Sequence, residues 1–167
     1  MNNRGFLLVE VTIAYVLLTV ALITLLPVFV LAIKAGKSTE QLQTATSLDQ
    51  ELMEEIRLRK WDQNSSSTPG HISNPSVTLG ADAGETDKTK FNDIDDFNGL
   101  SENPPKDPLN VSMTQFSAYT RAVTVNYVDS SNVVLSSPTT SNYKMVQVCT
   151  STSRMAGICI STLFTNR

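Results

Sequence analysis

Glu10 is the only charged residue in the 28-residue apolar run from Phe6 to Ile33. A carboxylate in a lipid-compatible helix costs a few kcal/mol, so an ionisable residue in such a place indicates a function by default. As a helix, the run would be ~42 Å long at 1.5 Å per residue, which exceeds the ~30 Å hydrocarbon core of a bilayer. The pattern predicts a membrane-compatible helix with one functional carboxylate near its start. An ordinary single-span anchor would explain the length, but not the position of Glu10.

The two cysteines, Cys149 and Cys159, are the second group with distinctive chemistry. An even number, close spacing and an exported context favour a disulfide, which would contribute roughly 2–3 kcal/mol by the chain-entropy argument. Two buried thiols are the alternative interpretation. A zinc site is disfavoured because His71 is the only histidine in the chain.

The densest acidic cluster consists of Asp93, Asp95 and Asp96 with the amide of Asn98. Oxygen ligands of this kind suit calcium, which takes six to eight of them. The spacing does not fit an EF-hand, because Phe97 occupies the fifth position counted from Asp93. The favoured interpretation is therefore that these side chains cap local turns. Calcium remains the weaker alternative, and we expect no other cofactor.

Two classes of function are disfavoured by composition. The formal net charge of −3 gives no basic surface for nucleic acid. With one histidine and neither a Gly-x-Ser-x-Gly sequence nor a phosphate-binding loop, the chain shows no recognisable catalytic constellation. We therefore expect a protein that is not an enzyme.

The elements that position these groups begin with one long helix. Residues 6–33 form its apolar part, and residues 34–63 continue it with an amphipathic pattern. Pro27 lies inside the apolar part and predicts a kink or local unwinding. The apolar positions of the second part recur every three or four residues: Leu42, Ala45, Leu48, Leu52 and Ile56.

The remainder reads as a long connection followed by a sheet. Residues 64–115 show little periodicity and five of the seven prolines, so we expect a connection with one short strand near 77–79. Residues 116–167 alternate with a period of two, which predicts strands at 119–127, 133–135, 143–150 and 158–164, with a hairpin loop at 151–157. The expected fold is α+β, with the long helix packed on a small antiparallel sheet of three or four strands.

The N-terminal pattern resembles the processing site of type IV pilins and type II secretion pseudopilins. The resemblance rests on Gly5-Phe6, on Glu10 and on the long apolar run, and Pro27 also lies where pilins commonly carry a proline. It implies the pilin fold and a prepilin peptidase that removes the leader, residues 1–5, and methylates the new N-terminus at Phe6. It also implies that Glu10 acts in subunit assembly.

A narrower resemblance, to minor pilins of the mannose-sensitive haemagglutinin type, rests on three segments. These are residues 48–56, residues 93–99 and residues 125–129. They imply a minor subunit rather than the principal one of a fibre. The C-terminal cysteine pair differs from that subgroup.

Together these features predict a structural protein, either a minor pilin or a pseudopilin. The resemblance implies a single-pass protein of the bacterial inner membrane with a periplasmic C-terminal domain, which later enters a pilus or pseudopilus filament. Its expected partners are the prepilin peptidase, other pilin or pseudopilin subunits and the inner-membrane assembly platform. A tip adhesin that binds a receptor is the alternative, as is a pseudopilin of a type II secretion system.

Overall fold

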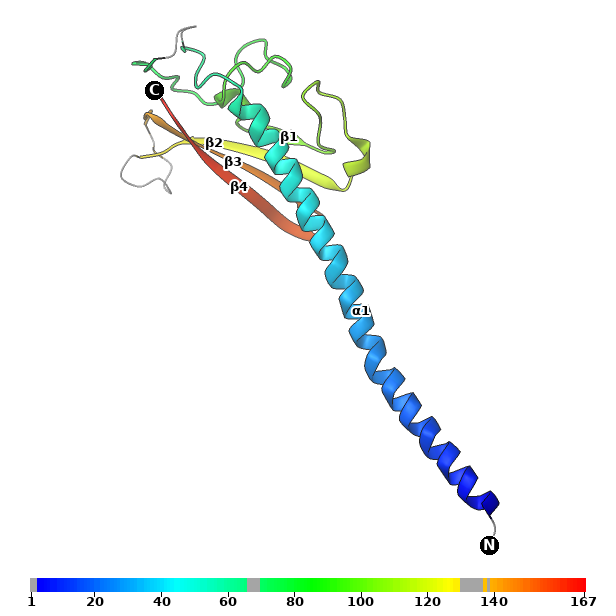
Figure 1. Ribbon diagram of the computed structural model, residues 1–167. Helices are drawn as coiled ribbons and strands as arrows, with labels where there is room; N and C mark the ends of the chain where they lie inside the picture. The colour runs from blue at the N-terminus through cyan, green and yellow to red at the C-terminus, as the bar shows by residue number, and fades with distance from the viewer. Residues whose placement is uncertain (1–2, 66–69, 130–136, 138) are drawn as a thin grey trace. The chain divides into compact units, whose positions relative to one another are not determined.

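The computed structural model describes residues 3–65, 70–129, 137 and 139–167, with side chains from Leu8 onward. It contains one long helix, α1 (Asn3–Arg57), and a sheet of four antiparallel strands (Figure 1). The chain forms two compact units, Met1–Leu42 and Gln43–Arg167, and α1 runs through both. The expected α+β class is therefore confirmed.

The strands follow one another in the sheet in the order of the sequence: β1 (Ser101–Glu102), β2 (Tyr119–Tyr127), β3 (Tyr143–Thr152) and β4 (Met155–Thr165). The predicted strand at 119–127 is confirmed with these bounds. The strands at 143–150 and 158–164 are confirmed and are longer than predicted, so the hairpin loop between them is shorter than 151–157. The predicted strand at 133–135 lies outside the described residues.

The C-terminal part of α1 packs on one face of this sheet. Leu52, Met53 and Ile56 share a buried core with the inward-facing valines of β2 and β3. Of the predicted apolar stripe, Ala45, Leu48, Leu52 and Ile56 are buried, whereas Leu42 is exposed. The inward residues alternate along β2 and β3, as expected for a half-buried sheet.

The structure bears on two expectations about the helix. The α1 assignment continues through Pro27 without interruption, so the expected local unwinding is not found there. The helix also ends at Arg57, before the predicted residue 63, in two turns where Leu58 and Arg59 donate backbone hydrogen bonds three residues back. Beyond this point Lys60 pairs with Asp93, so contacts with the connection replace the helical hydrogen bonds.

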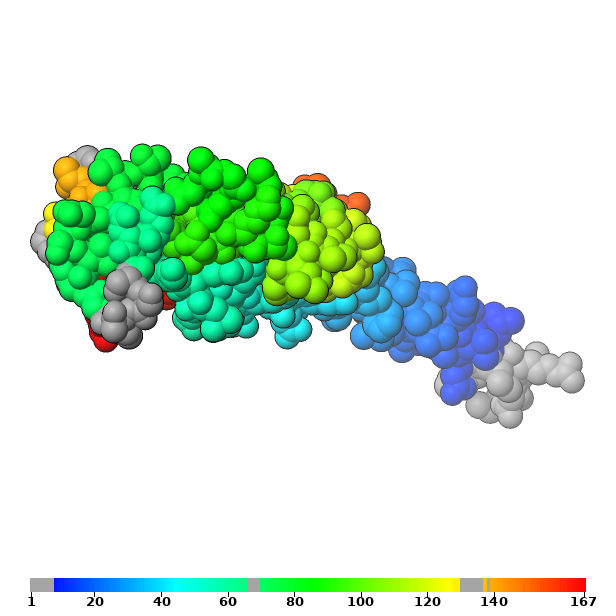
Figure 2. All heavy atoms as spheres, turned by 90° about the horizontal axis from the view of Figure 1, so that it is seen from above, coloured from blue at the N-terminus to red at the C-terminus, as the bar shows by residue number. Residues whose placement is uncertain are grey.

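The connection between α1 and β2 is more structured than the sequence indicates. It includes the short strand β1 and two 3-10 helices, η1 (Asp95–Phe97) and η2 (Thr114–Phe116). No strand forms at the described residues 77–79, so that prediction is wrong. In the space-filling view this connection, coloured green to yellow-green, makes up much of the near surface of the second unit (Figure 2). Phe91, Ile94 and Phe97 anchor it in the core.

Candidate functional site

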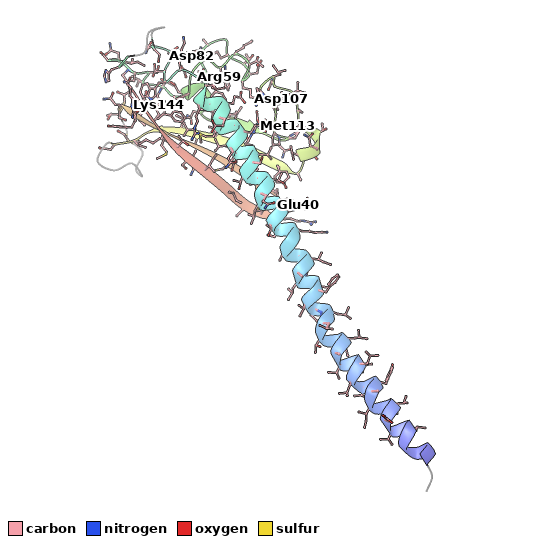
Figure 3. The ribbon with its side chains drawn as sticks, viewed as in Figure 1. Glu40, Arg59, Asp82, Asp107, Met113 and Lys144 are labelled. Carbon is pink, nitrogen blue, oxygen red and sulfur yellow. A yellow bond between two sulfur atoms is a disulfide. The ribbon has the colours of Figure 1, made fainter. Side chains whose placement is uncertain are left out.

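The N-terminal unit presents an apolar helical surface. An 18-residue stretch of α1 reaches a mean hydropathy of 2.9, and none of its residues is buried. Its side chains project outward around the helix (Figure 3). Large apolar side chains such as Leu17, Ile23 and Phe29 each expose more than half of their surface. By length and composition this helix could span a membrane.

The residues of the predicted processing and assembly site all lie on α1. Gly5 and Phe6 are within its first turns, and the Phe6 side chain falls outside the described part. Glu10 is exposed on the same helix, amid exposed apolar neighbours. The structure therefore places a carboxylate one to two turns beyond the Gly5-Phe6 junction, on a surface that is otherwise hydrocarbon.

The threonine hydroxyls in this surface are hydrogen-bonded within the helix. The hydroxyls of Thr12, Thr19 and Thr24 each donate to the backbone carbonyl three residues earlier, at 2.8–2.9 Å. A hydroxyl bonded in this way can enter an apolar phase at little cost. Glu10 differs from the threonines because an ionised carboxylate accepts hydrogen bonds only and cannot donate to a backbone carbonyl. In an apolar phase such a carboxylate is stabilised by a hydrogen-bond donor or a cation.

The disulfide between Cys149 and Cys159 is present. It joins directly paired residues of β3 and β4, whose Cα atoms lie 4.1 Å apart. Both side chains belong to the sheet face opposite α1, because the buried residues of β3 are its alternate positions. The bond ties the C-terminal hairpin together.

The four residues of the weak calcium candidate do not converge on one point. Asp93 accepts the backbone N–H groups of Asp95 and Asp96 at 3.0 and 3.3 Å, and Asp96 accepts those of Asn92 and Asp93 at 2.8 and 3.0 Å. These are turn-capping contacts of the favoured kind.

Asp95 and Asn98 point to other partners. Asp95 pairs with Lys144, while Asn98 accepts the N–H of Val125 and donates to the carbonyl of Leu79. A different acidic trio, Asp82, Asp93 and Asp96, brings one oxygen of each carboxylate within 4.8 Å of the others.

Crowding of carboxylates changes the acidity of Asp93. Burial raises its pKa to about 8, assisted by a hydrogen bond with Asp95 and by the negative charges of Asp95 and Asp96. A protonated Asp93 relieves repulsion in this turn. The loop is thus held by backbone hydrogen bonds and by one retained proton.

Lys144 is a central residue that sequence reasoning missed. Its ammonium lies 2.7 Å from Asp95 Oδ1 and 3.0 Å from Asp62 Oδ2, donates to the carbonyl of Trp61 at 2.9 Å, and sits 4.2 Å from the centre of the Trp61 ring. The side chain is fully buried, and Figure 3 labels Lys144 among the side chains of the second unit. Burial alone would raise the pKa of Asp62, but the amides of Asn64 and Ser76 and the Lys144 charge lower it below its usual value.

A second buried cluster surrounds Glu102 of β1. Arg121 donates to Glu102 Oε2 at 2.6 Å and to the carbonyl of Leu48 at 2.9 Å, which joins β2 to α1. Lys88 lies 3.3 Å from both Glu55 of α1 and Glu102. Both cations also donate to the carbonyl of Lys106. Helix, sheet and connection therefore meet at paired charges.

Asp49 provides a third polar contact between α1 and the sheet. Its carboxylate accepts the Thr150 hydroxyl at 2.6 Å, while its second oxygen has no hydrogen-bond partner. Burial raises the pKa of Asp49 to about 6, against the lowering effect of Thr150 and Arg121. The period-two alternation could have identified Arg121 and Lys144, since both occupy inward positions of predicted strands.

Comparisons of the chain with known protein families, with curated proteins and with solved structures give no match.

Proposed function

We propose that this chain is a minor pilin or pseudopilin, a structural subunit of a type IV pilus-like filament. The observation that carries the proposal is the division of α1. Its N-terminal part is apolar and exposed, while its C-terminal part packs on an antiparallel sheet. One helix can then serve first as a membrane span and later as an assembly surface, with neighbouring helices replacing lipid. The α+β arrangement is consistent with the pilin fold.

Processing is the first step of the proposal. A prepilin peptidase removes residues 1–5 and methylates the amine of Phe6, leaving the subunit in the inner membrane with its C-terminal unit in the periplasm. The intact mass of protein extracted from cells with an active peptidase tests this. We expect the mass of residues 6–167 plus one methyl group, and the full-length mass for Gly5→Ala. A full-length mass for the unaltered chain would refute processing.

Glu10 provides the second step, because a carboxylate enclosed in an apolar filament core needs a hydrogen-bond donor or a cation. In a filament the N-terminal ammonium of Phe6 from a neighbouring subunit meets this need. Leaving one partner of such a buried pair alone costs about 3–5 kcal/mol, so the pair fixes the register of assembly. The inner-membrane platform and other subunits complete the machinery.

Replacement of Glu10 separates assembly from folding. Glu10→Leu should give a processed, membrane-inserted subunit that enters filaments poorly. Thr12→Val is the matched control, because the Thr12 hydroxyl is already satisfied by the Val9 carbonyl. The measurement is the amount of each variant in sheared filaments relative to the membrane pool. Equal incorporation of the Glu10 variant would contradict the pairing.

A second role, that of a tip adhesin, has one supporting observation. A cleft of about 560 Å³ lies between residues 77–79, the end of β2 and the three residues Ser137, Thr139 and Thr140. It is lined by apolar and hydroxyl side chains, among them Leu79, Tyr127 and Thr139. Gene deletion distinguishes the roles: loss of fibres supports an assembly role, normal fibres without attachment support adhesion, and loss of secretion assigns the subunit to a type II system.

A further inference from the structure

The outer edge of β4 is an unprotected strand edge. The strand has eleven residues, from Met155 to Thr165, and contains neither a charged residue nor a proline. Exposed edges are normally blunted by charges, prolines, bulges or a covering segment, because their free N–H and C=O groups can pair with another chain. In the described part of the chain, β4 has backbone pairing with β3 alone, and the Arg57 side chain donates to the Thr162 hydroxyl at 3.4 Å.

The hydrogen-bond pattern shows which groups face this edge. Val123 of β2 exchanges backbone bonds with Gly99 and Leu100, so its N–H and C=O point away from β3. Because bonding alternates along antiparallel strands, Cys149 of β3 bonds toward β2 and does not bond its β4 partner, Cys159. The 4.1 Å Cα separation of the cysteines agrees with a narrow, non-hydrogen-bonded pair.

It follows that the backbone N–H and C=O groups of Cys159, Ser161 and Leu163 point outward. The intervening residues, Ile160 and Thr162, use theirs to hold β4 onto β3. The open edge therefore offers three donors and three acceptors at alternate positions, a ready template for another strand.

The core is also incomplete at this edge. Val146, Val148 and Thr150 on the inward face of β3 are fully buried. Their neighbours on β4 face the same way but remain half-exposed: Ile158, Ile160, Thr162 and Phe164. A strand added beside β4 would cover these side chains as well as satisfy the backbone groups.

We propose that β4 pairs antiparallel with β4 of a second copy of this chain, about a two-fold axis near Ser161. β4 itself has no charged residue, and the nearby Arg57, which donates to Thr162 at 3.4 Å, is paired with Glu54 at 2.6 Å, so like-charge repulsion between two copies is small. This register places Ile158 opposite Phe164 of the second copy on the inward face, and Ile160 opposite its Thr162. Each copy thereby covers the half-exposed side chains of the other.

The dimer is weak and depends on concentration. One added strand pair buries less surface than a standard stable interface, so association is transient in dilute solution and is favoured by confinement in one membrane. A two-fold contact closes on itself and cannot propagate a filament. The inference is therefore independent of the proposed filament function, and neither depends on the outcome of the other.

Ser161→Pro is the decisive variant. The Ser161 N–H points outward, so proline removes no bond between β3 and β4, and prolines are tolerated on edge strands in that position. It deletes the central donor of the proposed pairing and places a ring against the incoming strand. Ser161→Ala is the matched control, because it keeps the backbone N–H and, like the proline variant, removes the exposed hydroxyl with the 3.4 Å hydrogen bond that Gln147 donates to it.

The experiment uses full-length protein in detergent micelles over a range of concentrations. Analytical ultracentrifugation measures the monomer–dimer equilibrium, and hydrogen exchange measures the protection of the backbone amides of β4. The unaltered chain and Ser161→Ala should dimerise, with Ser161→Pro at least tenfold weaker. Exchange at residues 159, 161 and 163 should slow on dimerisation, whereas residues 160 and 162 are protected in both states.

Three outcomes would overturn the proposal. One is a monomer at every concentration, and another is a dimer that Ser161→Pro leaves intact, which would assign association to the apolar helix. The third is a monomer in micelles in which the amides of residues 159, 161 and 163 become protected only in host membranes. That result would mean that the β4 edge pairs with a different polypeptide.

Discussion

Replacement of Lys144 by methionine tests the buried charges of the second unit most directly. Methionine matches the length of the lysine stem and fills the same space beside Trp61 without the charge. The change leaves Asp62 and Asp95, which the ammonium contacts at 3.0 and 2.7 Å, without their cation in a site closed to water.

The expected loss is about 3–5 kcal/mol of unfolding free energy at neutral pH, because removal of one partner leaves a buried charge uncompensated. The substitution also removes the contact between the Lys144 ammonium and the Trp61 ring. The measured change in unfolding free energy already includes this loss, so the contact is not counted a second time. Domains are stable by only about 5–15 kcal/mol, so the second unit of this variant should be close to unfolding.

Denaturant unfolding of the full chain in micelles measures the effect. Trp61 is the only tryptophan, so its fluorescence reports on this site, with baselines recorded for each variant. Lys90→Met is the matched control. The Lys90 side chain is exposed, and its ammonium donates to the Gly84 carbonyl at 3.5 Å and to the Thr86 hydroxyl at 3.1 Å, so its loss should change stability by less than about 0.5 kcal/mol.

The pH dependence and a second substitution make the test specific. Without Lys144, the unpaired carboxylates of Asp62 and Asp95 can protonate as the pH falls. The loss of unfolding free energy relative to the unaltered chain should therefore become smaller from pH 7.5 to pH 4.5. Adding Asp95→Asn to Lys144→Met should recover part of the loss. Equal stability of Lys144→Met and the unaltered chain at pH 7.5, or a deficit that does not change with pH, would refute the assigned role of these charges.

Three further predictions concern the same unit. The pKa values of Asp93 and Asp49 are raised to about 8 and about 6, so the native state holds protons that the unfolded state releases. The unfolding free energy should therefore fall by more than about 1 kcal/mol from pH 5 to pH 8. Urea titrations at both pH values measure this change, and Asp93→Asn should remove most of it. Replacing both Cys149 and Cys159 by serine should cost roughly 2–3 kcal/mol in the same assay, equal to the effect of reductant on the unaltered chain, and a smaller effect of the reductant would contradict a contribution from the bond. Thermal melts at pH 7 with calcium and with a chelator should superimpose, because capping contacts and a retained proton already hold the acidic turn. A calcium-dependent rise of several degrees in the melting temperature, abolished by Asp96→Asn, would instead show a calcium site.

Periodicity made much of the architecture readable from the sequence. The unbroken apolar run and its amphipathic continuation determine a long helix, because side chains three and four residues apart share a helical face. The alternation in residues 119–127 determines a strand with one buried face, and it places Arg121 inward with the valines. Two cysteines leave one intramolecular pairing, which the structure contains.

Only the tertiary structure decided which partners the inward charges meet. Lys144 pairs with Asp62, 82 residues away along the chain, and Arg121 reaches the Leu48 carbonyl across 73 residues. The partners lie in or beside the connection between α1 and β2, which has no sequence periodicity. The path of this connection depends on core side chains such as Phe97 rather than on local secondary-structure preference. The end of α1 and the existence of β1 were hidden for the same reason, because contacts distant in sequence fix both. Local patterns determine which way a side chain faces, whereas the fold as a whole determines what it faces.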